Sequence, residues 1–281
     1  MTGNGTVMGG GTVPDPVASA PAPGAPAPAT PAPRRSSVIV TIAALTARGL
    51  LGRRRSLLLV LLALLPVAAA ILVRVAGRDA ADDEVATAIM DRLLVTTLLP
   101  IVGLVFGTAA LGAELEDGTA VFILVKPIER WRIVLGKLIV AVGLSIALVA
   151  PASFIAGAIL GPGGTGISGG VGAAVGTAIG ATVYATVFFA LSLVTGRALA
   201  IGLVYVLVWE GVLAGLLEGV AALSIRQYTL AITAAISTPG ATDPGLLDPR
   251  VALALSAVAV AVAALVAVRR LSSYEIGQAG D

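Results

Sequence analysis

The chain has 281 residues, of which 57% are hydrophobic and 12% charged, and its mean hydropathy is +1.01. Soluble domains carry about 25% charged residues, so this chain has too little polar surface to enclose a core in water and requires a bilayer as part of its solvent. The absence of Cys and His excludes thiol and histidine catalysis and the usual zinc ligand sets. With a net charge of only +2 and no recognisable nucleic-acid module, we expect no nucleic-acid partner.

The N-terminal region divides into a tail and a short helix. Residues 1–37 are dominated by Pro, Ala and Gly, a composition that predicts a disordered cytoplasmic tail. Residues 38–55 combine an apolar face with Arg48 and a triplet of arginines at 53–55. This pattern predicts an amphipathic helix in the inner interface, with its arginines toward anionic membrane lipids. A basic flank to the first span explains the triplet equally well.

Apolar runs long enough to cross a bilayer recur along residues 56–270. A helix needs about 20 apolar residues to span the hydrocarbon. The sequence therefore predicts an all-α polytopic membrane domain with six spans, at 56–76, 93–113, 134–160, 171–195, 199–217 and 251–268.

The distribution of Lys and Arg predicts the orientation of these spans. Positive residues are retained on the cytoplasmic side. With the N-terminus inside, thirteen of the 18 basic residues fall in cytoplasmic segments. We therefore expect both termini in the cytoplasm, including a short C-terminal tail at 271–281, and a multi-pass protein of the cytoplasmic membrane.

Two predicted spans carry glycine at every fourth residue. Small residues at this spacing let helix backbones approach closely within a bilayer. We interpret both stripes as helix-packing seams, formed by Gly172, Gly176 and Gly180 in the fourth span and by Gly211, Gly215 and Gly219 in the fifth.

One carboxylate, Glu210, lies well inside a predicted span. An ionisable group at such depth is costly and often functional. It is a candidate intramembrane polar site that lines a substrate path or caps a neighbouring helix. A hydrogen-bonded glutamate that fixes helix packing is an equal alternative.

The segment 114–137 is the only large charged cytoplasmic loop between the predicted spans. Its apolar residues fall at helical spacing, which is typical of a short helix that docks on a soluble partner or of a simple interfacial elbow. Gly136-Lys137 is followed by Leu and has no Gly five residues earlier, so it is not a P-loop. We find no energy-converting motif in the chain and expect it not to be an enzyme.

The same loop resembles the loop between the second and third spans of ABC-2-type ABC transporter permeases. The resemblance extends to VYVLVWEGVLAG in the fifth span and to LSIRQYTLA beyond it, and covers about residues 38–270. Glu129 departs from the small hydroxyl residue that the family often has before the arginine. The loop motif consists of Glu114, Glu116, Gly118, Thr119, Lys126, Pro127, Ile128, Arg130, Gly136 and Lys137.

The resemblance implies a permease that forms a substrate path with a second permease chain, identical or related. It implies a separate ABC ATPase subunit that binds ATP and Mg and contacts this chain through the 114–137 loop. It implies no cofactor in this chain. The coupling residues would be Glu114, Glu116, Gly118, Thr119, Lys126, Pro127 and Arg130. It also implies an outer segment, 219–250, whose helices dip into the membrane, and export as the direction of transport.

A secondary transporter or channel that works without an ATPase, through Glu210, is the alternative function. Such proteins show polar residues at the membrane midplane or inverted repeats with broken helices. Glu210 is nearly alone among the predicted spans, and the sequence shows no convincing internal repeat. The sequence does not select a transported substrate.

Overall fold

The computed structural model describes residues 2, 3, 5, 43–48, 50, 54–76, 85, 88–116, 130–160, 166–213, 223–239 and 245–273. The chain forms two units, Met1–Arg34 and Arg35–Asp281. The first unit contributes only three described residues, so the expected tail otherwise lies outside the described part of the chain. The fold below is that of the second unit.

The described elements of the second unit are all helical. Two of them, labelled η, are π-helices, in which the turn is wider than in an α-helix. In chain order the elements are α2 (Arg54–Val75), η1 (Ala88–Leu98), α4 (Leu99–Glu116), α6 (Arg130–Leu160), α7 (Ile167–Val194), α8 (Ala198–Val204), η3 (Tyr205–Leu213), α10 (Ile225–Ser237) and α11 (Pro249–Ser273).

Five of the six predicted spans correspond to helices that are long and apolar enough to cross a membrane. These are Leu57–Val75, Ala88–Leu111, Trp131–Leu160, Ile167–Val194 and Pro249–Leu271, counted over the described residues. The fifth predicted span, 199–217, corresponds to a shorter apolar helix, Ala198–Val212, and residues 214–222 lie outside the described part. The all-helical membrane fold is thus confirmed, whereas a sixth crossing remains a prediction.

The expected interfacial helix at 38–55 is described only in part. Residues 43–48 are helical, and Arg48 in this turn is exposed. Leu50 is buried within the hydrophobic core. Arg53 and the side chains of Arg54 and Arg55 lie outside the described part, so the position of the arginine triplet relative to the lipid stays a prediction.

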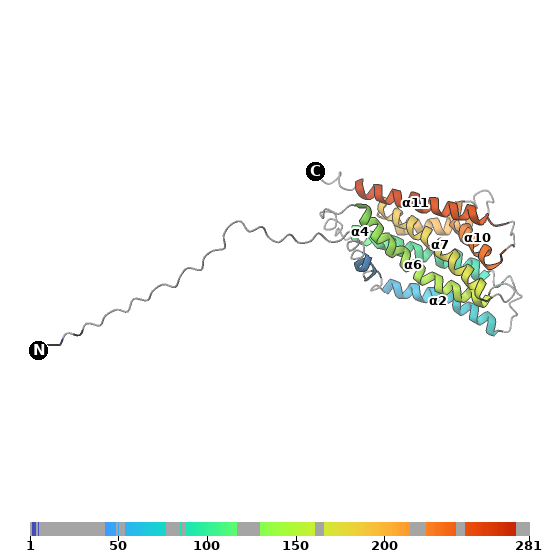
Figure 1. Ribbon diagram of the computed structural model, residues 1–281, viewed down its shortest axis with the longest axis horizontal. Coiled ribbons are helices and arrows are strands. Elements are labelled where there is room, and N and C mark those ends of the chain that lie inside the picture. Colours follow the sequence, from blue (N-terminus) through green and yellow to red (C-terminus); the bar gives the residue numbers. More distant parts are fainter. Residues whose placement is uncertain are drawn as a thin grey trace. The chain divides into compact units, whose positions relative to one another are not determined.

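Helix α7 lies at the centre of the bundle and contacts α4, α6, α8, α10 and α11. In its most apolar window 67% of the residues are buried, against 22% for α2 and for α11. These last two helices lie at opposite edges in Figure 1. The many Gly and Ala residues of α7 explain its position, since a helix with small side chains admits close neighbours on several sides.

Several hydroxyl side chains inside the bundle donate to carbonyl groups of their own helices. Thr108, Ser145 and Ser153 each donate to the carbonyl four residues earlier, at 2.7–2.8 Å. Thr186 and Ser256 do the same at 2.6 and 2.8 Å. Because hydrocarbon offers no partner for a polar group, these bonds lower the cost of placing these five hydroxyls in an apolar bundle.

Candidate functional site

The structure describes the two ends of the predicted coupling loop but not its middle. Glu114 and Glu116 belong to the last turn of α4, and Arg130 is the first residue of α6. The side chains of Glu114, Glu116 and Arg130 lie outside the described part of the chain. The whole of residues Gly118, Thr119, Lys126 and Pro127 lies outside it as well. Both flanking helices therefore extend into the segment 114–137, and residues 117–129 lie outside the described part.

Lys137, placed by the sequence at the cytoplasmic end of this loop, is a buried residue of α6. Its side chain is 1% exposed, and its ammonium donates to the carbonyl oxygen of Ala110 in α4 at 3.1 Å. The sequence pattern missed this burial, because a lysine that follows a charged loop ordinarily extends into the solvent. The bond joins the two helices that flank the loop.

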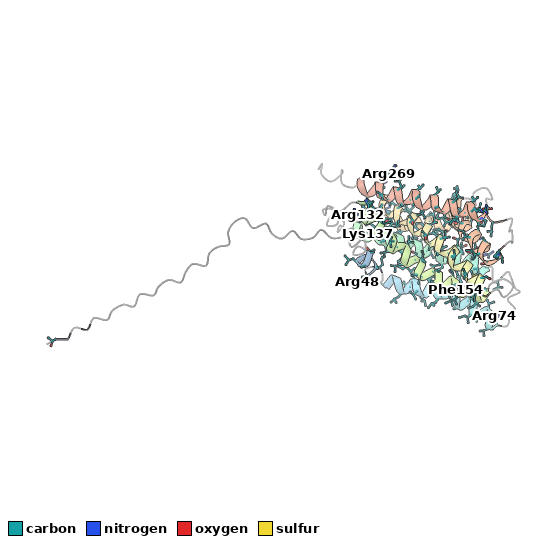
Figure 2. The ribbon with its side chains drawn as sticks, in the orientation of Figure 1. Arg48, Arg74, Arg132, Lys137, Phe154 and Arg269 are labelled. Atoms are coloured by element: carbon teal, nitrogen blue, oxygen red, sulfur yellow. The ribbon has the colours of Figure 1, made fainter. Side chains whose placement is uncertain are left out.

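Basic side chains gather at the end of the bundle to which this loop belongs. Figure 2 shows Arg48, Arg132, Lys137 and Arg269 at one end of the helices and Arg74 at the other. Arg132 lies over the ring of the half-exposed Trp131, 5.4 Å from its centroid, as expected for an aromatic residue near a headgroup region. The cytoplasmic assignment of that end stays a prediction.

Glu210 forms a cap at the N-terminus of α10. Its side chain is 1% exposed. The Ser224 hydroxyl donates to one carboxylate oxygen at 2.5 Å, and the backbone N–H of Ile225 donates to the other at 3.0 Å. The first N–H groups of a helix have no partner within it, and the helix dipole favours negative charge there. A carboxylate is therefore well suited to this position.

The π-helical turn of η3 directs a third donor to the same carboxylate. Tyr205 and Glu210 are five residues apart, which is one turn of a π-helix, and the Tyr205 hydroxyl donates to the carboxylate at 3.3 Å. The Tyr205 ring packs edge-on against Phe188 of α7, with centroids 6.2 Å apart, and stacks on Trp209 at 6.4 Å. These contacts fix the orientation of η3 against α7.

Arg226, the second residue of α10, forms a bidentate ion pair with Asp91 of η1. Its Nε donates to Oδ1 at 2.7 Å, and its Nη2 donates to Oδ2. The two side chains are 19% and 18% exposed. The sequence offers no sign of this pair, because the two residues are 135 positions apart.

The glycine stripe of α7 faces α10. A Cβ at Gly172 or Gly176 would lie 2.8 Å from the carbonyl oxygen of Thr233 or Thr229, respectively. A Cβ at Gly180 would collide with the hydroxyl of Thr229 and approach Leu99 of α4 to 2.7 Å. Later residues of α10 therefore contact earlier residues of α7, so the two helices are antiparallel. Helix α10 begins about midway along α7.

A second close seam, which the sequence interpretation did not single out, joins α4 to α7. A Cβ at Gly103 would lie 2.6 Å from Cβ of Tyr184, and one at Gly107 would lie 2.7 Å from the carbonyl oxygen of Ala185. The two glycines are again four residues apart, so the same spacing rule could have found them.

The predicted stripe of the fifth span is described only at Gly211. A Cβ there would meet only the carbonyl oxygen of Val206, in the same helix, at 3.6 Å. Gly211 thus contacts no other helix of the described residues, whereas Gly215 and Gly219 lie outside them.

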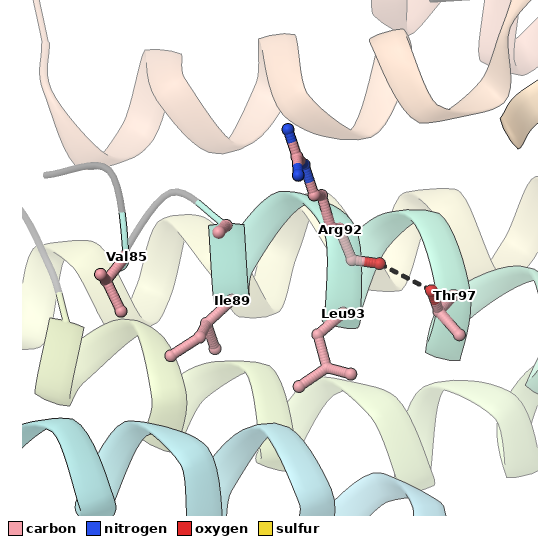
Figure 3. Close-up of a pocket in the computed structure, with 6 residues that line it drawn as sticks. Val85, Ile89, Arg92, Leu93 and Thr97 are labelled. Carbon is pink, nitrogen blue, oxygen red and sulfur yellow. Dashed lines mark hydrogen bonds between the residues drawn. The ribbon is translucent and has the colours of Figure 1, made fainter. Parts of the chain in front are cut away.

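A surface hollow of about 450 Å³ lies beside the start of η1. It is lined by Val85, Ala88, Ile89, Arg92, Leu93 and Thr97. Figure 3 shows Val85, Ile89 and Leu93 directed to one side of the helix and the Arg92 guanidinium to the other. The hollow is mainly apolar. Among the described residues no group of three or more acidic side chains could hold a metal ion.

These features define a polytopic helical membrane protein in which Glu210 caps a helix and Asp91 pairs with Arg226. The chain matches the family model described as ABC-2 family transporter protein over residues 53–272. The match covers most of the chain and every helix long enough to cross a membrane. The protein belongs to the ABC-2 transporter family and is a membrane permease of that family. No curated protein matches the sequence.

Proposed function

We propose that this chain is the membrane subunit of an ABC exporter, coupled to a separate ATPase subunit and paired with a second permease chain. The observation that carries the proposal is the family match over residues 53–272, which includes the helices on both sides of the 114–137 loop. The partner ATPase binds ATP and Mg, and this chain supplies no catalytic group or cofactor. We place the protein in the cytoplasmic membrane, with six crossings and both termini inside.

The coupling contact is proposed for the 114–137 loop at the basic end of the bundle. The loop connects α4 to α6, and both helices pack on the central α7. A displacement of the loop by the ATPase therefore acts directly on the central helix of the bundle. Glu114, Glu116, Gly118, Thr119, Lys126, Pro127 and Arg130 are the proposed residues of this joint.

An ATPase-independent transporter that works through Glu210 receives no support from the geometry. A glutamate that binds ions or substrate needs an accessible oxygen, whereas both oxygens of this carboxylate accept hydrogen bonds from Ser224, Ile225 and Tyr205. The contacts are those of a helix cap.

The test is co-purification from detergent with the P-loop ATPase encoded beside the chain. We expect the native chain to form a complex that contains two permease chains and two ATPase subunits, and to stimulate ATP hydrolysis. The Glu114→Ala/Gly118→Pro double variant and the single variant Thr119→Arg should lose binding or stimulation. Gly164→Pro, in the opposite loop, should retain both.

The variants are compared only where membrane insertion and gel-filtration profile equal those of the native chain. A native chain that neither binds nor stimulates any P-loop ATPase would refute the permease assignment. Equal losses in Gly164→Pro and Thr119→Arg would refute the placement of the joint.

A further inference from the structure

Arg92 is an arginine inside a membrane-spanning helix, and its guanidinium bonds to none of the described residues. It lies four positions after Ala88, where the span Ala88–Leu111 begins. Its side chain is exposed, and the nearby Thr97 hydroxyl bonds to its backbone carbonyl rather than to its side chain, at 2.7 Å. A charged group within a span is costly and ordinarily acquires a partner of opposite charge.

The carboxylates with described side chains are all engaged by other groups. Asp91, the preceding residue, accepts two hydrogen bonds from Arg226. Glu210 caps α10, and Asp248 accepts the backbone N–H of Arg250 at 2.8 Å. The start of η1 therefore carries one positive charge that the described residues do not balance.

This unbalanced cation borders the hollow of about 450 Å³ beside η1. Figure 3 shows the guanidinium on one side of the helix and the side chains of Val85, Ile89 and Leu93 on the other, so the hollow has a cationic edge and an apolar edge. Its volume lies in the range of about 300–1,000 Å³ that is typical of ligand sites. An apolar wall with one cation at its edge is complementary to an amphipathic anion.

The depth of Arg92 places its charge near the level of lipid headgroups. The span Ala88–Leu111 leads into the 114–137 loop, so its first turn lies at the opposite end of the bundle. An arginine within the first turn of a span extends its guanidinium to the interface while its stem stays on apolar surface. There it meets phosphate, which the planar guanidinium binds through two oxygens.

We propose that the hollow beside η1 binds one anionic phospholipid, whose phosphate pairs with Arg92 and whose acyl chain lies along Val85, Ile89 and Leu93. The bound lipid stabilises η1, and Asp91 of the same helix holds α10 through Arg226. The chain would therefore be more stable with an anionic lipid than without one. This site does not depend on the ATPase partner.

The test is thermal unfolding of the full chain, purified in detergent, with three added probes. Dioleoyl-phosphatidylglycerol carries a charged phosphate and acyl chains, dioleoyl-phosphatidylcholine carries the same chains without net charge, and glycerol 3-phosphate carries the phosphate without the chains. We expect phosphatidylglycerol at saturation to raise the unfolding temperature by about 5 °C, and each of the other two by less than about 1 °C. An equal gain with phosphatidylcholine or with glycerol 3-phosphate would overturn the proposal.

The variants assign the effect to the hollow. Arg92→Gln should lose the gain, Arg92→Lys should retain part of it, and Leu93→Ser should weaken it while leaving the cation in place. Arg74→Gln is the matched control, because Arg74 is an exposed arginine in the last turn of α2 that does not line the hollow. It should keep the full gain. A gain that survives in Arg92→Gln, or that Arg74→Gln loses equally, would refute the site.

Native mass spectrometry identifies the occupant directly. The native chain should retain an additional phosphatidylglycerol relative to Arg92→Gln, in detergent that contains equal amounts of phosphatidylglycerol and phosphatidylcholine. A dimer that retains no such lipid would assign the hollow to a second copy of this chain and would overturn the proposal.

Discussion

The Glu210 carboxylate accepts a hydrogen bond from the backbone N–H of Ile225 at 3.0 Å and thereby caps the first turn of α10 within the bundle. Helix α10 begins about midway along α7, where no bulk water is at hand to satisfy its leading amides. A residue 15 positions earlier in the chain supplies the acceptor instead. The intramembrane charge is thus part of the scaffold that holds α10 in place.

Replacing Glu210 should destabilise the protein in proportion to the acceptors lost. Glu210→Ala leaves the Ser224 hydroxyl and the Ile225 amide unsatisfied, so we expect the free energy of unfolding to fall by roughly 2–4 kcal/mol. Glu210→Gln retains one acceptor oxygen and should lose less. The measurement is SDS titration followed by tryptophan fluorescence. A Glu210→Gln variant of native stability that no longer supports coupled ATP hydrolysis would instead indicate a substrate path.

The Asp91–Arg226 pair should be coupled in stability. Because the pair is bidentate and more than four-fifths buried, we expect a double-mutant cycle of Asp91→Asn and Arg226→Gln to give a coupling energy of about 1 kcal/mol or somewhat above. Arg226→Lys should not replace the arginine, because an ammonium cannot bond both oxygens in this geometry. Arg92→Gln, an exposed change in the same π-helix as Asp91, serves as the control and should be uncoupled from Arg226.

The seam between α7 and α10 should not accept a methyl group. In Gly176→Ala the new Cβ would lie 2.8 Å from the Thr229 carbonyl oxygen, so we expect a loss of roughly 1–3 kcal/mol in the free energy of unfolding. Gly143→Ala in α6 is the matched control, because a Cβ there meets nothing within 4 Å among the described atoms. Its effect should be neutral or slightly stabilising, since Ala favours a helix over Gly. Equal losses in the two variants would contradict the seam.

Thiol labelling should decide the number of crossings. The native chain contains no cysteine, so a single introduced thiol is an unambiguous probe. With six crossings, Gly196→Cys faces the cytoplasm and Pro239→Cys faces outward, so an impermeant maleimide added to intact cells should label only the second. Both positions are exposed in the structure. Labelling of both or of neither would show that the chain between them does not cross the membrane.

Composition and apolar run length were sufficient to predict the membrane class and the approximate position of every long helix. The boundaries were less accurate: α6 begins at Arg130 rather than at 134, because Trp131 and Arg132 continue a helix that hydropathy alone ends at the first charge. The π-helical turns of η1 and η3 were not predicted, since periodicity analysis assumes 3.6 residues per turn.

The polar contacts were less predictable than the helices. Glu210 stood out in the sequence because a lone charge in an apolar run is conspicuous, and capping was one of its three interpretations. Its donors were not predicted, since Ser224 and Ile225 resemble any other residues of a connecting segment. Nothing in the sequence links Asp91 to Arg226. Only the three-dimensional arrangement, in which α10 contacts η1, reveals that they form a pair.

The central position of α7 has a consequence for biosynthesis. Its glycine stripe is covered by α10, and another of its faces is covered by α11, yet the ribosome produces both of those helices after α7. Once α7 has emerged, this surface therefore contacts lipid or an insertion chaperone until the last quarter of the protein follows. Native packing of α7 is completed only after α10 and α11 have emerged, and a chain truncated before α10 cannot close its own centre.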